Sequence, residues 1–314
     1  MIERNATIAI LIPCYNEEAA IGAVVHDFRK ALPGADIYVY DNNSKDQTVA
    51  RAHAAGAIVR QEMRQGKGNV VRRMFADIEA DIYILVDGDD TYDASAAPKL
   101  CAKLIDEGLD IVSGRRIATK TDAYRRGHVW GNHMLTGLTA TMFRVQLLDM
   151  LTGYRVMSRR FVKSFPFTAE GFGIETELSV HAVRLMMPFA EVDTPYKERP
   201  VGSVSKLNTW RDGFKILLTI AGLVREERPM VFFSAIFAVL AATSLCFGIP
   251  VIREYFETGL VPRLPSAVLA TSLMLLGFLS LVSGVILDTV TQGRWENKRM
   301  AYLAIPSPHG LTLP

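Results

Sequence analysis

The stretch IYILVDGDD, residues 82–90, decides the fold of this chain. Ile82–Val86 is a strongly apolar run, which is typical of a strand buried inside a sheet. The acidic turn Asp87–Asp90 follows it directly. Two earlier apolar runs, Thr7–Ile12 and Ile37–Tyr40, also end in polar turns. Buried strands that each end in polar groups indicate an α/β domain whose ligands bind at one edge of the sheet.

Segments with helical spacing alternate with these apolar runs along the first two thirds of the chain. We predict strands at Thr7–Ile12, Ile37–Tyr40, Ala57–Arg60, Ile82–Val86, Asp110–Ser113, Tyr154–Met157 and Phe189–Pro195. We predict helices at Ala19–Leu32, Thr48–Ala55, Asn69–Ala80, Ala96–Glu107, Gly131–Phe143 and Glu175–Met187. The alternation predicts a mostly parallel sheet with helices on both faces. The polar clusters at the expected strand ends are Tyr15–Glu18, Asp41–Asp46, Asp87–Asp93 and Gly114–Arg116.

Two uncharged stretches near the C-terminus are long enough to cross a membrane. Met230–Ile252 and Leu264–Leu287 each exceed twenty residues without one Asp, Glu, Lys or Arg. A helix of that length spans a hydrocarbon core of roughly 30 Å. Eight Lys and Arg residues flank the pair and two lie in the connecting loop, so we expect both flanks in the cytoplasm. The alternative is a pair of buried core helices.

The segment before these stretches has its apolar residues on one helical face. Leu207–Val224 therefore suits an amphipathic helix in the headgroup region, and the alternative is a helix packed on the soluble domain. The expected organisation is an α/β domain at 1–205, a juxtamembrane helix at 206–229, a two-helix transmembrane hairpin at 230–287 and a cytoplasmic tail at 288–314.

The composition of the chain limits the cellular compartments and the classes of binding partner that we expect. The net charge of +2 does not call for a polyanion, so we expect no nucleic acid partner. Three cysteines without paired or metal-ligand spacing suit a reducing compartment. Met1–Thr7 is short and charged and lacks the apolar core of a signal peptide. We therefore expect a multi-pass protein of the cytoplasmic membrane, with its α/β domain in the cytoplasm.

The acidic turn after Ile82–Val86 has the pattern of a metal site. Asp87 and Asp89 stand at alternate positions, so both carboxylates can converge on one divalent cation. Hard oxygen ligands suit Mg²⁺ or Mn²⁺, which often take further ligands from water and substrate phosphates. The alternative is a solvated acidic turn.

A second constellation combines the polar segments after the first two strands. PCYNEE at 13–18 and YDNNSKD at 40–46 would meet at the same sheet edge. An Asp at a strand end can accept hydrogen bonds from a base N–H or a ribose hydroxyl. Each segment alone is a weak signal, because a segment rich in Asn and Asp is more often an ordinary turn. Gly66-Lys67-Gly68 lacks full phosphate-loop spacing, although Lys67 could reach a nucleotide.

Taken together, these motifs resemble the family 2 glycosyltransferases with a GT-A fold. The matching segments are IPCYNEE at 12–18, DNNSKDQT at 41–48, GKG at 66–68 and DGDD at 87–90, and the resemblance covers about residues 5–205. Three further segments look like the polyprenyl-phosphate branch of that family: LTGYR at 151–155, GFGIETEL at 171–178 and RPVGSVSKL at 199–207. That branch includes dolichol-phosphate mannose synthases and bacterial undecaprenyl-phosphate glucosyltransferases, and often carries a C-terminal membrane hairpin.

The resemblance implies roles for the matching positions on the donor side. Asp41 would hold the nucleotide base. The nucleotide pocket would be lined by Pro13, Tyr15 and Glu17. Asp87 and Asp89 would form the metal motif, with Asp89 closest to the ion and the donor diphosphate.

The resemblance also implies a set of basic and hydroxyl residues for the phosphates. Arg115 would face the lipid phosphate. The residues expected to close over donor and acceptor phosphates are Arg199, Ser203, Ser205 and Lys206.

The implied activity is transfer of a hexose from a nucleotide sugar to polyprenyl phosphate, with inversion at the anomeric carbon. The acceptor is already an anion, so metal and Arg or Lys groups matter more than a general base. UDP is favoured over GDP, and the alternatives are a different glycan acceptor or a non-catalytic membrane scaffold. Relatives include tetramers, and Gly277 and Ser280–Gly284 offer small-residue surfaces for packing between copies.

Overall fold

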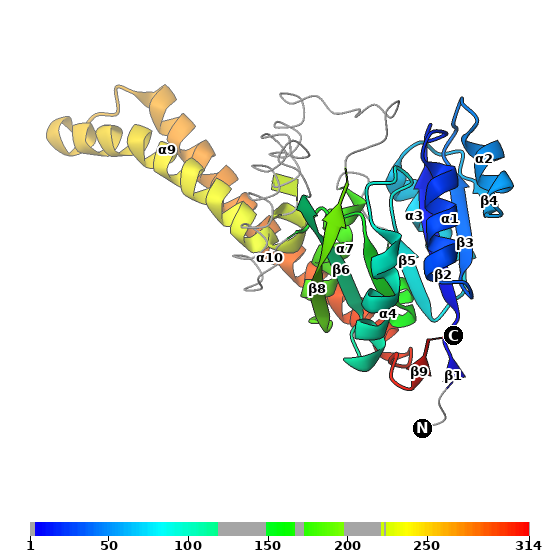
Figure 1. Cartoon of the computed structure of the whole chain (residues 1–314). Helices are drawn as coiled ribbons and strands as arrows, with labels where there is room; N and C mark the ends of the chain where they lie inside the picture. Colours follow the sequence, from blue (N-terminus) through cyan, green and yellow to red (C-terminus); the bar gives the residue numbers. More distant parts are fainter. Residues whose placement is uncertain (1–3, 119–148, 167–172, 198–220, 223, 314) are drawn as a thin grey trace. The chain divides into compact units, whose positions relative to one another are not determined.

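The computed structural model describes residues 4–118, 149–166, 173–197, 221–222 and 224–313 of the 314-residue chain. These residues fall into two compact units (Figure 1). The first comprises residues 1–216 together with 298–314, and the second comprises residues 217–297. The predicted helix Gly131–Phe143 and most of the predicted juxtamembrane helix lie outside the described residues.

The first unit is built on a seven-stranded sheet with the order β4-β3-β2-β5-β7-β6-β8. Its strands are β2 (Ile8–Cys14), β3 (Asp36–Asp41), β4 (Ile58–Gln61), β5 (Ile82–Leu85), β6 (Ile111–Ala118), β7 (Arg155–Ser158) and β8 (Phe189–Tyr196). Neighbouring strands are parallel except where β7 pairs with β5 and β6. The predicted mostly parallel α/β sheet is confirmed.

Helices cover both faces of this sheet. They are α1 (Ile21–Ala31), α2 (Thr48–Ala54), α3 (Lys67–Asp77), α4 (Ala97–Asp106), α6 (Arg159–Ser164) and α7 (Ile174–Arg184), with a short 3₁₀ turn η1 (Ala94–Ala96) before α4. Buried residues of α1 and α4 pack against one face of the sheet. On the opposite face, the Phe75 ring of α3 contacts Tyr83 of β5 and Phe165, the residue just after α6.

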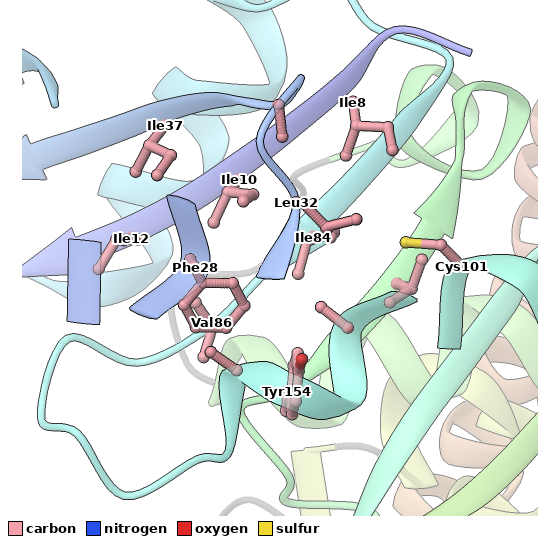
Figure 2. Packing of buried hydrophobic residues seen from close by; sticks show 14 of the residues in the cluster. Ile8, Ile10, Ile12, Phe28, Leu32, Ile37, Ile84, Val86, Cys101 and Tyr154 are labelled. Atoms are coloured by element: carbon pink, nitrogen blue, oxygen red, sulfur yellow. The ribbon is translucent and has the colours of Figure 1, made fainter. Parts of the chain in front are cut away.

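The core follows from the two-residue period of a strand. Ile8, Ile10 and Ile12 of β2 alternate to the same face, where Figure 2 shows them with Phe28 and Leu32. These five side chains are all at least 93 % buried, and each such side chain contributes roughly 1.5–3 kcal/mol to folding. β2 is buried on both faces, so it reads as a continuous apolar run.

The strand order creates a switch point beside β2. The chain runs from β2 outward through β3 to β4, then returns to place β5 on the other side of β2. The carboxyl ends of β2, β3 and β5 therefore meet at one edge, the usual ligand-binding edge of such a sheet. Because β7 is antiparallel, with Arg155 opposite Leu85, the residues just before β7 reach the same edge.

Two long apolar helices make up most of the second unit, and the last turns of the second helix, from residue 298, belong to the first unit. α9 (Pro229–Thr258) has 30 residues and α10 (Leu264–Leu303) has 40, and both are long and apolar enough to cross a membrane. The Ser280 hydroxyl donates to the Phe233 carbonyl (3.0 Å), and a Cβ at Gly277 or Gly284 would press on α9 side chains. Gly277, Ser280 and Gly284, part of the small-residue surface expected to pack between copies, thus face α9 of the same chain, and packing between copies stays a prediction.

The C-terminal residues complete the first unit. α10 continues to Leu303, and β9 (Leu311–Thr312) pairs in parallel with β1 (Arg4–Asn5). Residues 298–314, the greater part of the expected tail, thus group with the α/β sheet.

Candidate functional site

The loops that follow β2 and β3 are joined by hydrogen bonds. The N–H of Asn16 donates to the Ser44 hydroxyl (2.8 Å), and the Asn16 side-chain oxygen accepts from the N–H of Lys45 (2.8 Å). The N–H of Glu17 donates to the Thr48 hydroxyl (2.9 Å). Asn16 has a φ of 54°, a left-handed conformation that Asn adopts more readily than most residues. The two loops form one connected wall beside the switch point.

The residues predicted to bind the nucleotide lie in this wall or at the strand ends that lead into it. Asp41 is buried at the end of β3, 2 % exposed, and its carboxylate accepts a hydrogen bond from the N–H of Ser44 (3.2 Å). Pro13 is half-buried near the end of β2, and Tyr15 and Glu17 are half-buried in the loop that follows it. The structure therefore brings these four predicted residues to the same edge of the sheet.

Asn42 fixes the loop that leads to Lys67. Its side-chain nitrogen donates to the carbonyls of Glu62 and Arg64, both at 2.8 Å, and its side-chain oxygen accepts from the N–H of Gly66 (2.7 Å). Gly66 has a φ of 126°, which a residue with a side chain rarely adopts. Lys67 then begins α3 with its position set by this loop.

Lys67 lies between two carboxylates of the site. Its ammonium contacts the Asp87 carboxylate directly and lies 2.6 Å from Oε1 of Glu175. Although burial alone would lower it, Asp87 and Glu175 raise the pKa of Lys67, so the ammonium stays charged. Burial raises the pKa of Asp87, and the Lys67 charge opposes that rise. The Asp87 side chain remains 30 % exposed, so a ligand can reach it.

Gly153, just before β7, lets the backbone approach Asp87. A Cβ built there would overlap Oδ2 of Asp87 and lie 2.7 Å from its Cγ. The N–H of Gly153 donates to the Tyr92 hydroxyl (2.7 Å), which holds the backbone in place. Only glycine fits this position without displacing the Asp87 carboxylate.

Arg155 ties the Gly153 loop to α7. Its side chain is 1 % exposed and donates to the carbonyls of Met150 (2.7 Å), Thr152 (3.1 Å) and Glu175 (2.9 Å). Burial lowers the pKa of Arg155 to about 10, so the guanidinium is still charged at neutral pH. This buried cation sets the start of α7, and with it the Glu175 backbone.

Asp89 is buried, 4 % exposed, and its Oδ1 accepts from the Thr91 hydroxyl (2.6 Å). The predicted acidic residues act together on the buried thiol of Cys14. Burial raises the pKa of Cys14, and four carboxylates raise it further: Glu17, Asp41, Asp87 and Asp89. The predicted nucleotide and metal carboxylates therefore all lie near the Cys14 thiol at the end of β2.

Arg115 pairs across β6 and β8 with its register partner Asp193. The guanidinium donates to both carboxylate oxygens, at 2.5 and 2.7 Å. This charge-assisted pair lowers the pKa of Asp193. The next residue, Arg116, makes a comparable bidentate pair with Asp149, with both contacts at 2.7 Å. Any ligand anion at Arg115 therefore competes with a carboxylate already in place.

Four predicted residues, Arg199, Ser203, Ser205 and Lys206, lie outside the described residues. Within the described parts of the chain, no group of three or more His, Cys, Asp or Glu side chains could by itself hold a metal ion. The predicted metal site at Asp87 and Asp89 would therefore need ligands from a substrate or from water, and it stays a prediction.

Sequence reasoning assigned no role to Gly153, Arg155 or Glu175. Their segments, LTGYR and GIETEL, were matched as motifs, but the spacing alone does not show which side chain faces Asp87. Glu175 is 108 positions from Lys67 in the chain, so only the fold reveals their contact.

Comparison with known proteins identifies the family of this chain. The family model described as Glycosyl transferase family 2 matches residues 9–165. Glycosyltransferase AglJ of Haloferax volcanii is 33 % identical over 285 residues, covering 90 % of this chain and 93 % of that protein. The dolichyl-phosphate hexose transferase of the same organism is 31 % identical over 221 residues, covering 70 % and 95 %.

Solved structures show the same fold. A crystal structure of glucosyl-3-phosphoglycerate synthase from Mycobacterium tuberculosis contains Mn²⁺, UDP and glucosyl-3-phosphoglycerate. It superposes with a TM-score of 0.54 at 26 % identity, covering 70 % of this chain and 79 % of that chain. The expected GT-A-like α/β fold is confirmed.

Proposed function

Because this chain belongs to glycosyltransferase family 2, we propose that it transfers a hexose from a nucleotide sugar to polyprenyl phosphate at the cytoplasmic face of a membrane. One observation carries the proposal: the chain joins a switch-point site with clustered carboxylates to two helices of membrane-spanning length. A site on a membrane anchor suits an acceptor with a polar end and an apolar end.

The similarity to relatives supports a lipid acceptor. The match to glycosyltransferase AglJ extends over 90 % of this chain, which exceeds the α/β domain alone. A second relative is named as a dolichyl-phosphate hexose transferase, and dolichyl phosphate is a polyprenyl-type acceptor. The match covers 95 % of that protein. The UDP found in the solved glucosyl-3-phosphoglycerate synthase favours UDP over GDP as the donor nucleotide here.

The residues at the site fit a divalent cation. Asp87 and Asp89 are hard oxygen donors beside each other, and the ammonium against Asp87 shows that the place favours positive charge. Asp87 and Asp89 would hold Mg²⁺ or Mn²⁺, which would neutralise the departing diphosphate. The two carboxylates leave the remaining ligand positions to the donor and water.

The chain's own residues would position the two substrates. Asp41 and the wall formed by the loops after β2 and β3 would hold the nucleotide. Lys67 would contact the diphosphate, and Arg115 would orient the lipid phosphate, since guanidinium grips phosphate with paired hydrogen bonds. The phosphate monoester attacks as an anion, so direct displacement with inversion at the anomeric carbon needs no dedicated base.

A second candidate acceptor is a small soluble phosphate ester. The observation favouring it is the structural match to glucosyl-3-phosphoglycerate synthase, whose complexes contain phosphoglyceric acid. The two apolar helices favour the lipid acceptor, because an enzyme with a soluble acceptor does not need to be held at a membrane.

The test incubates the full-length protein in detergent with labelled UDP-hexoses or GDP-hexoses, Mn²⁺ or Mg²⁺, and either undecaprenyl phosphate or 3-phosphoglycerate. The proposal expects label in the organic phase, and only with the lipid. Label in a water-soluble product with 3-phosphoglycerate supports the second candidate. No transfer from any donor contradicts both and supports a scaffold.

The acceptor role of Arg115 has its own test. Arg115→Ala should raise the KM for the lipid phosphate severalfold or more, while the KM for the nucleotide sugar changes little. Asp193→Asn, which frees the guanidinium from its carboxylate, provides the matched comparison and should not weaken the lipid. Equal increases in both KM values for Arg115→Ala would contradict this assignment.

A further inference from the structure

Lys67 already supplies a positive charge to the predicted metal carboxylate. Its ammonium contacts Asp87 on one side and lies 2.6 Å from Glu175 on the other. Asp87 follows β5, Glu175 lies in the first turn of α7, and Lys67 begins α3. One ammonium therefore bridges three elements at the place where the proposed function puts a divalent cation.

We propose that Lys67 is a placeholder cation that keeps the divalent cation from binding before the donor. This inference rests on the function proposed above. Lys67 neutralises Asp87 while the site has no nucleotide, then transfers to the donor diphosphate and leaves Asp87 to the metal. Metal and donor would consequently bind together rather than one after the other.

Charge repulsion gives the physical basis. An ammonium in contact with Asp87 repels a dication approaching the same carboxylate, and two charges a few ångströms apart interact strongly at a partly buried site. A diphosphate brings enough negative charge to accommodate both cations. Binding of the donor thus removes the repulsion between the Lys67 ammonium and the divalent cation.

The geometry favours movement of the lysine over movement of the carboxylate. Asp87 packs against the Gly153 backbone, which Tyr92 holds in place. The Lys67 side chain is flexible and 32 % exposed, so it can turn toward a diphosphate without disturbing the core. Glu175 holds the ammonium close to the site, and Arg155 fixes the Glu175 backbone.

The experiment measures binding of Mn²⁺ to the full-length protein in detergent by the loss of the free-ion electron paramagnetic resonance signal. Wild type is compared with Lys67→Met, with Lys67→Arg and with Lys103→Met. Lys103 pairs with Glu107 on the exposed side of α4, so its loss controls for removal of a surface ion pair. Lys67→Gln replaces the Met variant if the latter melts at a lower temperature than wild type.

Without UDP, Lys67→Met should bind Mn²⁺ about tenfold or more tightly than wild type, since it lacks the repelling charge. Lys67→Arg and Lys103→Met should bind as weakly as wild type. With saturating UDP, the advantage of Lys67→Met should vanish, because Lys67 of the wild type then contacts the diphosphate.

Equal Mn²⁺ affinity of wild type and Lys67→Met without UDP would overturn the proposal. An advantage of the same size with and without UDP would also overturn it, because the lysine would then not transfer to the diphosphate. The comparison without UDP needs neither sugar nor lipid. Its result therefore stands even if lipid glycosylation is never detected.

Discussion

At the scale of single residues, Gly153 shows how closely the backbone supports the site. The Asp87 carboxylate occupies the space that a Cβ at this position would need. Gly153→Ala should therefore displace Asp87 and reduce transfer by roughly 10²-fold, as expected when one group that stabilises charge in the transition state is lost. A steady-state transfer assay measures the effect.

Gly22→Ala is the matched control for this substitution. A Cβ at Gly22 in α1 meets nothing within 4 Å, so the variant should keep full activity. Thermal melting of both variants checks that the fold survives. Full activity in Gly153→Ala would show that Asp87 tolerates displacement and would contradict its assigned role.

The residue scale also shows what sequence can and cannot reveal. The position of Asp41, Asp87 and Asp89 at one edge of the sheet was predictable, because the carboxyl ends of parallel strands meet at that edge. Glu175 and Arg155 were not, since their contacts join elements whose packing no local pattern encodes. The same applies to the Asp193 partner of Arg115, which depends on the register of β8 against β6.

At the scale of elements, His181 couples α7 to α6. Its ring packs edge-on against Phe161 and Phe165, at 5.2 and 5.1 Å between centroids, and its Nε2 lies 3.2 Å from the Ser164 hydroxyl. Burial lowers the pKa of His181 from 6.5 to about 3. The folded chain thus keeps this imidazole neutral over a pH range in which the unfolded chain protonates it.

This difference predicts loss of stability in acid. Between pH 6.5 and about 3 the unfolded state binds the extra proton, so stability falls as the pH falls. At pH 5 the loss is about 2 kcal/mol relative to pH 8. Denaturant unfolding at the two pH values should show this loss for wild type and a smaller one for His181→Gln.

His53→Gln, at an exposed position on α2, is the control and should lose as much stability as wild type. If His181→Gln and wild type lose equal stability between pH 8 and pH 5, another group governs the acid response.

Most elements were predictable from periodicity, and the direction of one strand was not. The apolar run at residues 154–157 indicated a strand, yet a two-residue period is the same for either direction. The structure shows β7 antiparallel to β5, which brings Gly153 to Asp87. The sequence therefore predicted the strand β7, but it did not predict the antiparallel direction that places Gly153 beside Asp87.

At the scale of the molecule, the end of α10 is bound into the α/β unit. The Tyr302 hydroxyl donates to Asp110 (2.8 Å), which is fully buried and also accepts from Arg160 (2.5 and 2.8 Å). The Arg160 guanidinium lies 4.7 Å over the Tyr302 ring. Apolar length predicted α10, but nothing local indicated that its last turn returns to the sheet.

Tyr302→Phe should destabilise the α/β unit by about 1.5–3 kcal/mol, because the buried Asp110 carboxylate loses a donor. Tyr302→Ala should destabilise it further, since it also removes the ring beneath Arg160. Thermal melting of the full-length protein measures both. Unchanged melting in both variants would mean that residues 298–314 do not stabilise the α/β unit.

The proposed metal-assisted transfer is tested by comparing wild type with Asp89→Asn in one assay, which follows labelled hexose from a nucleotide sugar to undecaprenyl phosphate. Wild type should place label in the extracted lipid. Asp89→Asn should lower the rate roughly 10²-fold or more while melting at an unchanged temperature. If Asp89→Asn labels the lipid at the wild-type rate, Asp89 does not assist the transfer. If wild type labels no lipid with any donor, the chain does not glycosylate polyprenyl phosphate.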